Sequence, residues 1–332
     1  MANMKPSAPK IPADARGRLS LDAASALQDM VRVKSKHLRF FWETPLYYRC
    51  DESAFELYKP QYHFIDELRV AQGAHPDPLY YHNKDKPRAL REMQFGLNEQ
   101  ISACMATNDP LGIKETLVDL FQDAVRSPTS ANVEMAARTV SRLVDDYLKN
   151  ESVINKLVSV ITKDYTTAVH SINVMTLTIR FGFYSQYSLS ECKELGLAAL
   201  LHDVGKTEVS TKVLKAPRRL TDNEFEVMKQ HTLRGYRLLS QSLLPRETCL
   251  TALQHHERVD GSGYPFGTTN FCWPAEVIGF IDCFEAITCH ERPYRVALRP
   301  FPALWKIRNE LFSGKFNKEV FRQFVLNLAQ KK

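Results

Sequence analysis

His-His-Glu-Arg-Val-Asp-Gly-Ser-Gly-Tyr-Pro, at residues 255–265, is the stretch on which the interpretation of this chain turns. Two adjacent imidazoles, a carboxylate and a glycine-rich turn place several metal-ligand atoms beside one loop. A second such group, His-Asp-Val-Gly-Lys, lies upstream at residues 202–206. It follows the run Leu-Gly-Leu-Ala-Ala-Leu-Leu at 195–201, which is apolar on all sides and therefore predicts a buried helix. Both groups indicate a helical domain that binds metal.

Further candidate ligands lie on the helices predicted around these two groups. His231 follows Phe225 and Met228 at spacings of three, so it shares their helical face. Asp282 lies within the apolar run Val-Ile-Gly-Phe-Ile-Asp-Cys-Phe, and a buried carboxylate is costly unless it is paired or binds a metal. The full set of candidate ligands is His170, His202, Asp203, His231, His255, His256 and Asp282.

This set exceeds what one ion needs but fits two divalent ions that share a carboxylate, and we nominate Asp203 as that bridge. Mixed nitrogen and carboxylate ligation favours iron or manganese over a tetrahedral thiolate zinc site. Any one of these histidines taken alone is more often a hydrogen-bonded core residue. The adjacent pairs His202-Asp203 and His255-His256 make that structural explanation the weaker one for the set as a whole.

The rest of the chain predicts a mainly α protein with a small α+β domain in front. Residues 1–18 contain three prolines and are expected to form a flexible leader. Aromatic residues broken by turn residues predict strands, so 19–95 is expected to be a small α+β N-terminal domain with a sensory or regulatory role. Residues 96–150 are expected to be a helical linker, in which Asp109-Pro110 and Ser127-Pro128 begin helices.

Residues 151–332 predict a larger, all-helical domain. Ser188 with Glu191, and Thr221 with Glu224, have the spacing of capping boxes, which predicts helices at about 190–203 and 222–240. Pro245 and Pro274 mark the starts of two further helices, the first running into His255 and the second through Asp282.

Composition narrows the function classes. The 332 residues are 44% hydrophobic and 25% charged, as in an ordinary soluble protein. The 44 Lys and Arg are dispersed among 38 acids without a basic stripe, which disfavours a nucleic-acid polymer as partner. Seven cysteines without a C-x-x-C pair predict reduced thiols. No apolar run has the length of a membrane span or signal peptide, so we expect a cytoplasmic protein with no membrane partner.

Together these residues resemble the HD-GYP phosphodiesterases of bacteria, a branch of the HD-domain metal-dependent phosphohydrolases. The similarity covers about 165–295 and includes the segments quoted above and Arg-Pro-Tyr-Arg at 292–295, in the family's order. It implies an HD-type helical bundle over 151–332 and hydrolysis of cyclic di-GMP to the linear dinucleotide pGpG, with GMP as a further product. The implied mechanism is attack on phosphorus by a hydroxide that bridges two metal ions.

The resemblance also implies roles for individual residues. The metal ligands would be the seven residues already nominated, and Thr166 stands where family members with three metals carry a Glu, which implies two ions. The catalytic groups would be Asp203 and Lys206, with Lys206 holding a substrate phosphate. Guanine would stack on Tyr264 or Tyr294. The substrate-binding residues implied are Lys206, Gly263, Tyr264, Pro265, Arg292, Tyr294 and Arg295.

Alternatives of another class stay open. The chain has Val209-Ser210 and Ala216-Pro217-Arg218 where the family usually has Ile-Pro and Lys-Pro-Gly. These departures leave room for a receptor that binds cyclic di-GMP with little or no turnover. A phosphohydrolase acting on dNTPs or ppGpp is a third reading, which the complete Gly-Tyr-Pro loop disfavours. A monomer and a homodimer are both compatible with the sequence.

Overall fold

The computed structural model describes residues 18–20, 29–51, 54–126, 130–149, 166–288 and 298–329, in two compact units, Met1–Leu97 and Asn98–Lys332. Residues 1–17 of the expected leader lie outside the described part, and Arg18 begins a strand. The predicted fold class, mainly α with a small α+β region in front, is confirmed. The finer division into leader, α+β domain, linker and C-terminal domain stays a prediction.

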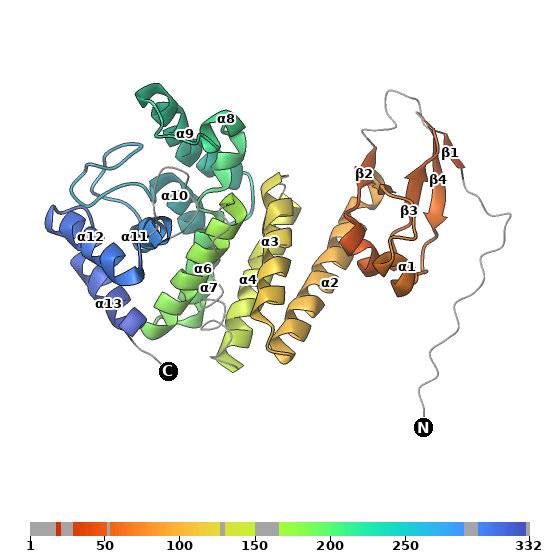
Figure 1. Cartoon of the computed structure of the whole chain (residues 1–332), viewed down its shortest axis with the longest axis horizontal. Helices are drawn as coiled ribbons and strands as arrows, with labels where there is room; N and C mark the ends of the chain where they lie inside the picture. The colour runs from red at the N-terminus through yellow and green to blue at the C-terminus, as the bar shows by residue number, and fades with distance from the viewer. Residues whose placement is uncertain are drawn as a thin grey trace. The chain divides into compact units, whose positions relative to one another are not determined.

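The first unit is built on an antiparallel sheet, whose five described strands follow the order β1-β4-β3-β5-β2 (Figure 1). Tyr47 lies opposite Leu57 on one side and Tyr80 on the other, so aromatic runs predicted as strands pair with each other. The strands are β1 (Arg18–Ser20), β2 (Met30–Arg32), β3 (Leu46–Arg49), β4 (Ala54–Lys59) and β5 (Leu79–His82).

Short helices and the start of a long one cover this sheet's core. Phe41, Leu46 and Leu79 are fully buried in one cluster with Ala89, which lies on α2. The helical elements are the 3-10 helices η1 (Ser35–Phe40) and η2 (Asn83–Asp85) and the α-helices α1 (Glu67–Ala71) and α2 (Lys86–Ala106), the last of which crosses the boundary between the units.

All the regular elements described in the second unit are helices, joined by loops (Figure 1). α3 begins at Pro110, where Asp109 accepts a hydrogen bond from Gly112 N at 3.0 Å, whereas Ser127-Pro128 lies outside the described residues. The elements are α3 (Pro110–Arg126), α4 (Ser130–Lys149), α6 (Thr167–Tyr184), α7 (Leu189–Leu201), η3 (Val204–Glu208), α8 (Thr211–Leu214), α9 (Asp222–Leu239), α10 (Arg246–Gln254), α11 (Trp273–Thr288), α12 (Pro300–Phe312) and α13 (Lys318–Ala329).

Local sequence signals set the starts of the helices that carry the predicted ligands. Both predicted capping boxes are present: Ser188 with Glu191 begins α7, and Thr221 with Glu224 begins α9. α10 begins directly after Pro245 and ends before the two adjacent histidines. The apolar run 195–201 is buried, as predicted, because α7 packs against α4, α6, α10 and α11. None of the described helices combines the length and apolar character that a bilayer crossing requires.

Candidate metal centre

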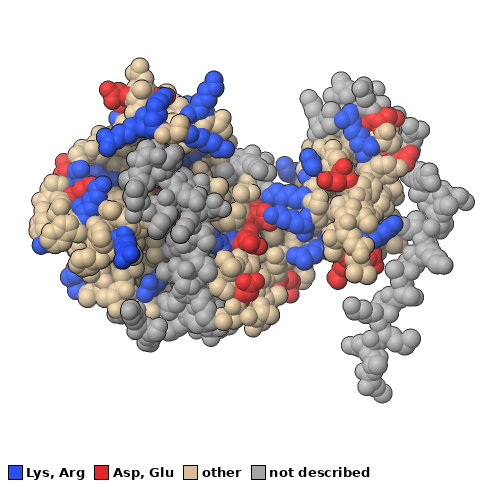
Figure 2. All heavy atoms as spheres, viewed as in Figure 1, with Lys and Arg blue, Asp and Glu red and all other residues tan. Residues whose placement is uncertain are grey.

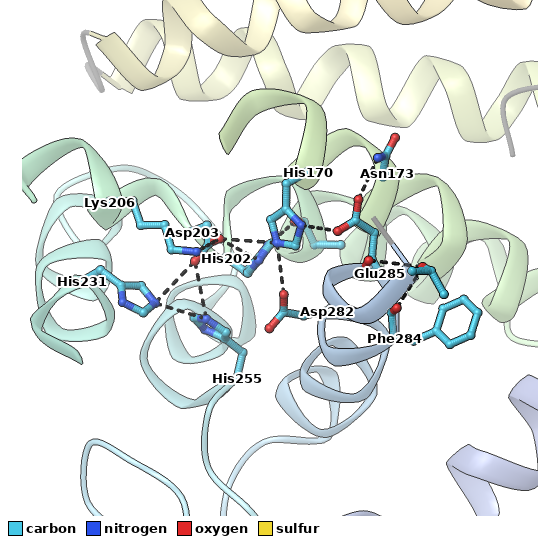
Figure 3. A network of polar contacts seen from close by, with 12 residues as sticks. His170, Asn173, His202, Asp203, Lys206, His231, His255, Asp282, Phe284 and Glu285 are labelled. Atoms are coloured by element: carbon cyan, nitrogen blue, oxygen red, sulfur yellow. Dashed lines mark hydrogen bonds and ion pairs between the residues drawn. The ribbon is translucent and has the colours of Figure 1, made fainter. Parts of the chain in front are cut away.

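All seven nominated ligands come together inside the second unit, although they come from five different helical segments. Figure 3 labels all of them except His256. α6 presents His170 in its first turn, after Thr166 caps the helix by accepting a hydrogen bond from Val169 N. The C-terminal ends of α7 and α10 present His202 and His255, which are each the residue after the last helical one. Asp203 follows His202, His256 follows His255, His231 lies on α9 and Asp282 on α11.

These side chains form two groups that share one residue. Asp203 offers an oxygen to a group with His231, His255 and His256, and to a second group with His170 and His202, and within each group the ligand atoms lie within 4.8 Å of one another. Asp282 joins the second group, because its Oδ1 lies 3.0 Å from His170 Nε2. Asp203 therefore lies where a carboxylate bridging two cations would have to lie.

Backbone carbonyls fix the orientation of three of the imidazoles. His202 Nδ1 lies 2.6 Å from Ala199 O, and His231 Nδ1 lies 2.7 Å from Met228 O. His255 Nδ1 lies 3.1 Å from the carbonyl oxygen of Thr251. A carbonyl oxygen can only accept, so each Nδ1 donates and carries the proton. Each Nε2 then has a free lone pair, and these Nε2 atoms face the carboxylate of Asp203.

A carboxylate fixes the orientation of a fourth imidazole, that of His170. His170 Nδ1 donates to Glu285 Oε2 at 2.6 Å, while Asn173 Nδ2 donates to Glu285 Oε1 at 2.8 Å (Figure 3). Glu285 is buried on α11, one turn after Asp282. A carboxylate that holds the far nitrogen of an imidazole is the usual support of a metal-ligating histidine, because it fixes the ring and raises its basicity.

Burial of the histidines and the charges around Asp203 shift the pKa values in this cluster toward the metal-binding states. Burial lowers the pKa of His231 to about 4, against the opposing effect of Asp203. It also lowers the pKa values of His255 and His256 well below the usual histidine range. For Asp203 burial acts to raise the pKa, but Lys206, His202 and His231 outweigh it and hold the pKa well below its usual range. Neutral imidazoles, which keep a lone pair on Nε2, and an ionised carboxylate are the forms that bind cations.

The electrostatics of the cluster fit divalent cations. Asp203 Oδ1 is buried and no described residue donates a hydrogen bond to it, while His231 Nε2 and His255 Nε2 lie 3.4 and 3.7 Å away. Those two Nε2 atoms are only 3.4 Å from each other. Lone pairs that converge on an anionic oxygen repel one another in a buried environment unless a cation lies between them. The donor set of imidazole and carboxylate suits a first-row ion.

Lys206 lies on the same turn as the shared carboxylate. Its Nζ donates a hydrogen bond to Asp203 Oδ2, and its side chain retains 16% of its exposure. Gly205, which directly precedes Lys206, has no room for a side chain, because an added Cβ would lie 2.0 Å from His231 O and 2.4 Å from Gly235 N. This close contact of η3 with α9 holds Asp203 and His231 in the same small volume.

The Gly-Tyr-Pro loop lies against the histidine pair. Tyr264 N donates to His256 O at 3.2 Å, and the Tyr264 ring stacks on His256 at 4.5 Å between centroids. Gly263 is required here, since an added Cβ would lie 2.5 Å from Glu257 Cα. Buried Glu257 fixes the loop by accepting hydrogen bonds from Phe266 N at 2.8 Å and Thr268 N at 3.1 Å. Pro265 follows Tyr264 through a cis peptide bond.

Sequence reasoning noted Glu257 without assigning it a structural role and did not single out Asn173 or Glu285. For the last two a signal was present: Asn173 lies three residues after His170 and Glu285 three after Asp282, which puts each on the same helical face as a ligand. Of the predicted substrate-binding residues, Arg292, Tyr294 and Arg295 lie outside the described residues.

Residues 168–320 match the family model described as the HD domain. The chain carries an HD domain. The similarity expected from the sequence is thus confirmed, and the matched range contains all seven nominated ligands. The fold agrees over a wider range: an HDG"Y"P protein from Bdellovibrio bacteriovorus superposes with a TM-score of 0.62 at 15% identity, over 91% of this chain and 100% of that one.

Two curated relatives carry names that describe cyclic dinucleotide hydrolysis. A cyclic di-GMP phosphodiesterase of Pseudomonas aeruginosa is 33% identical over 218 residues, which are 64% of this chain and 51% of that protein. A 3'3'-cGAMP-specific phosphodiesterase of Vibrio cholerae is 27% identical over 289 residues, 76% of this chain and 61% of that protein. The chain thus spans about half to three fifths of the length of these relatives.

Proposed function

We propose that this chain is a metal-dependent phosphodiesterase that hydrolyses cyclic di-GMP to linear pGpG, and with a second cut to GMP. The observation that carries the proposal is the pair of ligand groups sharing Asp203, with Lys206 on the same turn. The relatives named above support the substrate class, and the HD domain supports the dependence on metal.

Two divalent cations, for which iron and manganese suit the donor set, would be held by the seven ligands. His170, His202 and Asp282 would hold one ion, His231, His255 and His256 the other, and Asp203 both. Such ions supply Lewis acidity toward phosphoryl oxygens and lower the pKa of water.

The chain's own groups would do the remaining work. Lys206 places an ammonium next to Asp203, where it can neutralise charge on a phosphate oxygen. The backbone carbonyls that hold His202, His231 and His255 keep those Nε2 atoms directed inward, so the centre is organised before substrate arrives.

The test is reconstitution of anaerobically purified protein with Fe(II) or Mn(II), followed by chromatography of the products from cyclic di-GMP. We expect pGpG to form, and Asp203→Asn to lower kcat by more than about 100-fold because it removes a ligand of both groups. Asp222→Asn is the matched control, since Asp222 is an exposed aspartate at the start of α9. Unchanged activity of Asp203→Asn, or full activity in excess chelator, would contradict the proposal.

Two other outcomes have support of their own. The relative named as 3'3'-cGAMP-specific makes that nucleotide a second candidate substrate, so kcat/KM should be measured for both. The departures at Val209-Ser210 and Ala216-Pro217-Arg218 support a receptor without turnover. In the structure Val209 and Ala216 are buried, and Arg218 pairs with Glu224 at 2.7 Å. Tight binding without product over hours would favour the receptor.

A further inference from the structure

Resting on this proposed function, we infer that Phe225 and Lys229 of α9, together with Tyr264 of the Gly-Tyr-Pro loop, bind one purine nucleotide half of the substrate. We call these three residues the purine wall. Neither Phe225 nor Lys229 is a metal ligand or a member of the predicted substrate-binding set, so the wall adds a base-recognition element beside the metal centre.

The rings of the wall continue the imidazoles of the metal centre outward. The centroids of His255 and His256 lie 4.1 Å apart, and His256 stacks on Tyr264 at 4.5 Å with 27° between the planes. Tyr264 in turn meets Phe225 at 6.0 Å with 81° between the planes. The aromatic series therefore runs without a break from two nominated ligands to a side chain at the surface.

The exposure of Phe225 is unusual for a ring that only packs. It is 43% exposed, although it lies one contact away from a partly buried tyrosine. The Lys229 ammonium lies 5.0 Å from the Phe225 centroid and 5.8 Å from that of Tyr264. Edge-on packing against Tyr264 accounts for part of the Phe225 surface and leaves the remainder in solvent, next to a cation. An exposed π surface beside an ammonium suits a nucleotide, which combines a planar base with an anionic phosphate.

The position of the wall also agrees with the connectivity of a cyclic dinucleotide. Each base is joined to its phosphates through one sugar, so a phosphate at the metal centre brings a base within one nucleotide of it. The Tyr264 ring lies 4.5 Å from the ring of the nominated ligand His256, and the Phe225 ring lies 6.0 Å beyond Tyr264, so both rings are near enough to the metal centre to contact that base.

The charge around the wall favours an anionic ligand. Residues 204–239, which include η3, α8 and α9, contain eight basic and four acidic side chains. Figure 2 shows Lys and Arg side chains gathered over the part of the second unit where α8 and α9 lie. A positive potential of this kind raises the local concentration of a doubly charged cyclic dinucleotide.

The test is steady-state kinetics of metal-loaded Phe225 variants with cyclic di-GMP. Phe225→Ala and Phe225→Leu should raise KM about tenfold with little change in kcat, because one base–aromatic stack is lost. Phe225→Trp should restore a KM near that of the wild type. Val227→Ala is the matched control, because Val227 is also 43% exposed on α9 but lies two residues away, on another face. All variants should hydrolyse methyl p-nitrophenyl phosphate, a diester without a base, at the wild-type rate.

Lys229 is tested in the same assay. Lys229→Met removes the ammonium and should raise KM for cyclic di-GMP about tenfold, as expected for loss of one charged contact. Glu226→Gln removes the carboxylate that pairs with Lys229 at 2.6 Å but keeps the ammonium, so it should leave KM unchanged or lower it.

The outcomes separate this inference from the proposed hydrolysis. An unchanged KM in Phe225→Ala, in protein that turns over cyclic di-GMP, overturns the wall and leaves the proposed function intact. If the wild-type protein binds the nucleotide without cleaving it, the proposed hydrolysis is wrong. The wall is then supported if Phe225→Ala raises the dissociation constant for cyclic di-GMP, and overturned if that constant is unchanged. If wild-type protein neither binds nor cleaves cyclic di-GMP, the wall is overturned together with the proposed function.

Discussion

Glu285 shows how one buried carboxylate can determine the orientation of a metal ligand. Each of its oxygens accepts a hydrogen bond from α6, one from His170 and one from Asn173. Glu285, a carboxylate outside the nominated ligand set, thereby directs His170 Nε2 toward Asp282. Adjacent ligands such as His202-Asp203 could be predicted from sequence because the chain itself joins them. The pairing of Glu285 with His170 could not, since 115 positions separate the two residues and only the packing of α11 on α6 brings them together.

Replacement of Glu285 by glutamine should weaken metal binding with little loss of fold. An amide can offer an NH2 group to the imidazole, so the Nδ1-protonated tautomer is no longer favoured. We expect the affinity for Mn(II) to fall about 10- to 100-fold, measured by competition with a chelator of known affinity. Glu276→Gln is the control, because Glu276 lies on the same helix and accepts a hydrogen bond from Asn317 at 3.2 Å. Equal affinities for the two variants would exclude the orienting role of Glu285.

At the scale of elements, the helix starts were predictable and the contacts between elements were not. The capping boxes of α7 and α9 act within four residues, so their signal is local and survives in the sequence. The sheet order β1-β4-β3-β5-β2 depends on pairing between distant strands, as for Met30 opposite His82. The close contact of η3 with α9 at Gly205 is likewise a tertiary feature, and glycine alone did not reveal it.

Gly205→Ala should destabilise the second unit and displace His231. The added methyl meets backbone atoms, which cannot rotate away, so we expect a loss of about 1–3 kcal/mol in the free energy of unfolding, measured in urea. Metal affinity should fall with it. Gly235→Ala provides the graded comparison, because its Cβ would meet Gly205 N at 3.3 Å and should cost less. The reverse ranking of the two variants would refute the packing argument.

At the scale of the whole molecule, the buried histidines couple metal binding to folding and to pH. The seven candidate ligands come from helices between 167 and 288, so no short fragment of the second unit contains the complete site. The sequence predicted the ligand set because its residue types and spacings are local. Asp203 was also nominated from sequence as the shared carboxylate, but the division of the other ligands into two groups around it depends on the packed bundle.

The metal-free protein should become less stable as the pH falls from about 6.5 to 4. The folded pKa of His231 is about 4 and the unfolded value is 6.5, so within this window the unfolded chain binds the extra proton. Above pH 6.5 His231 is neutral in both the folded and the unfolded chain, so it does not lower the free energy of unfolding there. His231 alone accounts for a loss of about 3 kcal/mol, checked by urea unfolding of chelator-treated protein across that range.

His231→Gln removes one of the titrating groups and should make the dependence on pH less steep, while His255 and His256 continue to contribute. If the wild-type protein and this variant show the same slope between pH 4 and 6.5, the buried His231 does not contribute to it.

Because the Lys206 ammonium already neutralises Asp203, an incoming cation has to take that carboxylate from a tethered competitor. In the metal-free protein the Lys206 ammonium thus supplies the positive charge next to Asp203 that a bound cation would supply. Binding of a cation at Asp203 should therefore free the Lys206 side chain from this ion pair, and stronger labelling of Lys206 by an acylating reagent in metal-loaded than in metal-free protein would report occupancy.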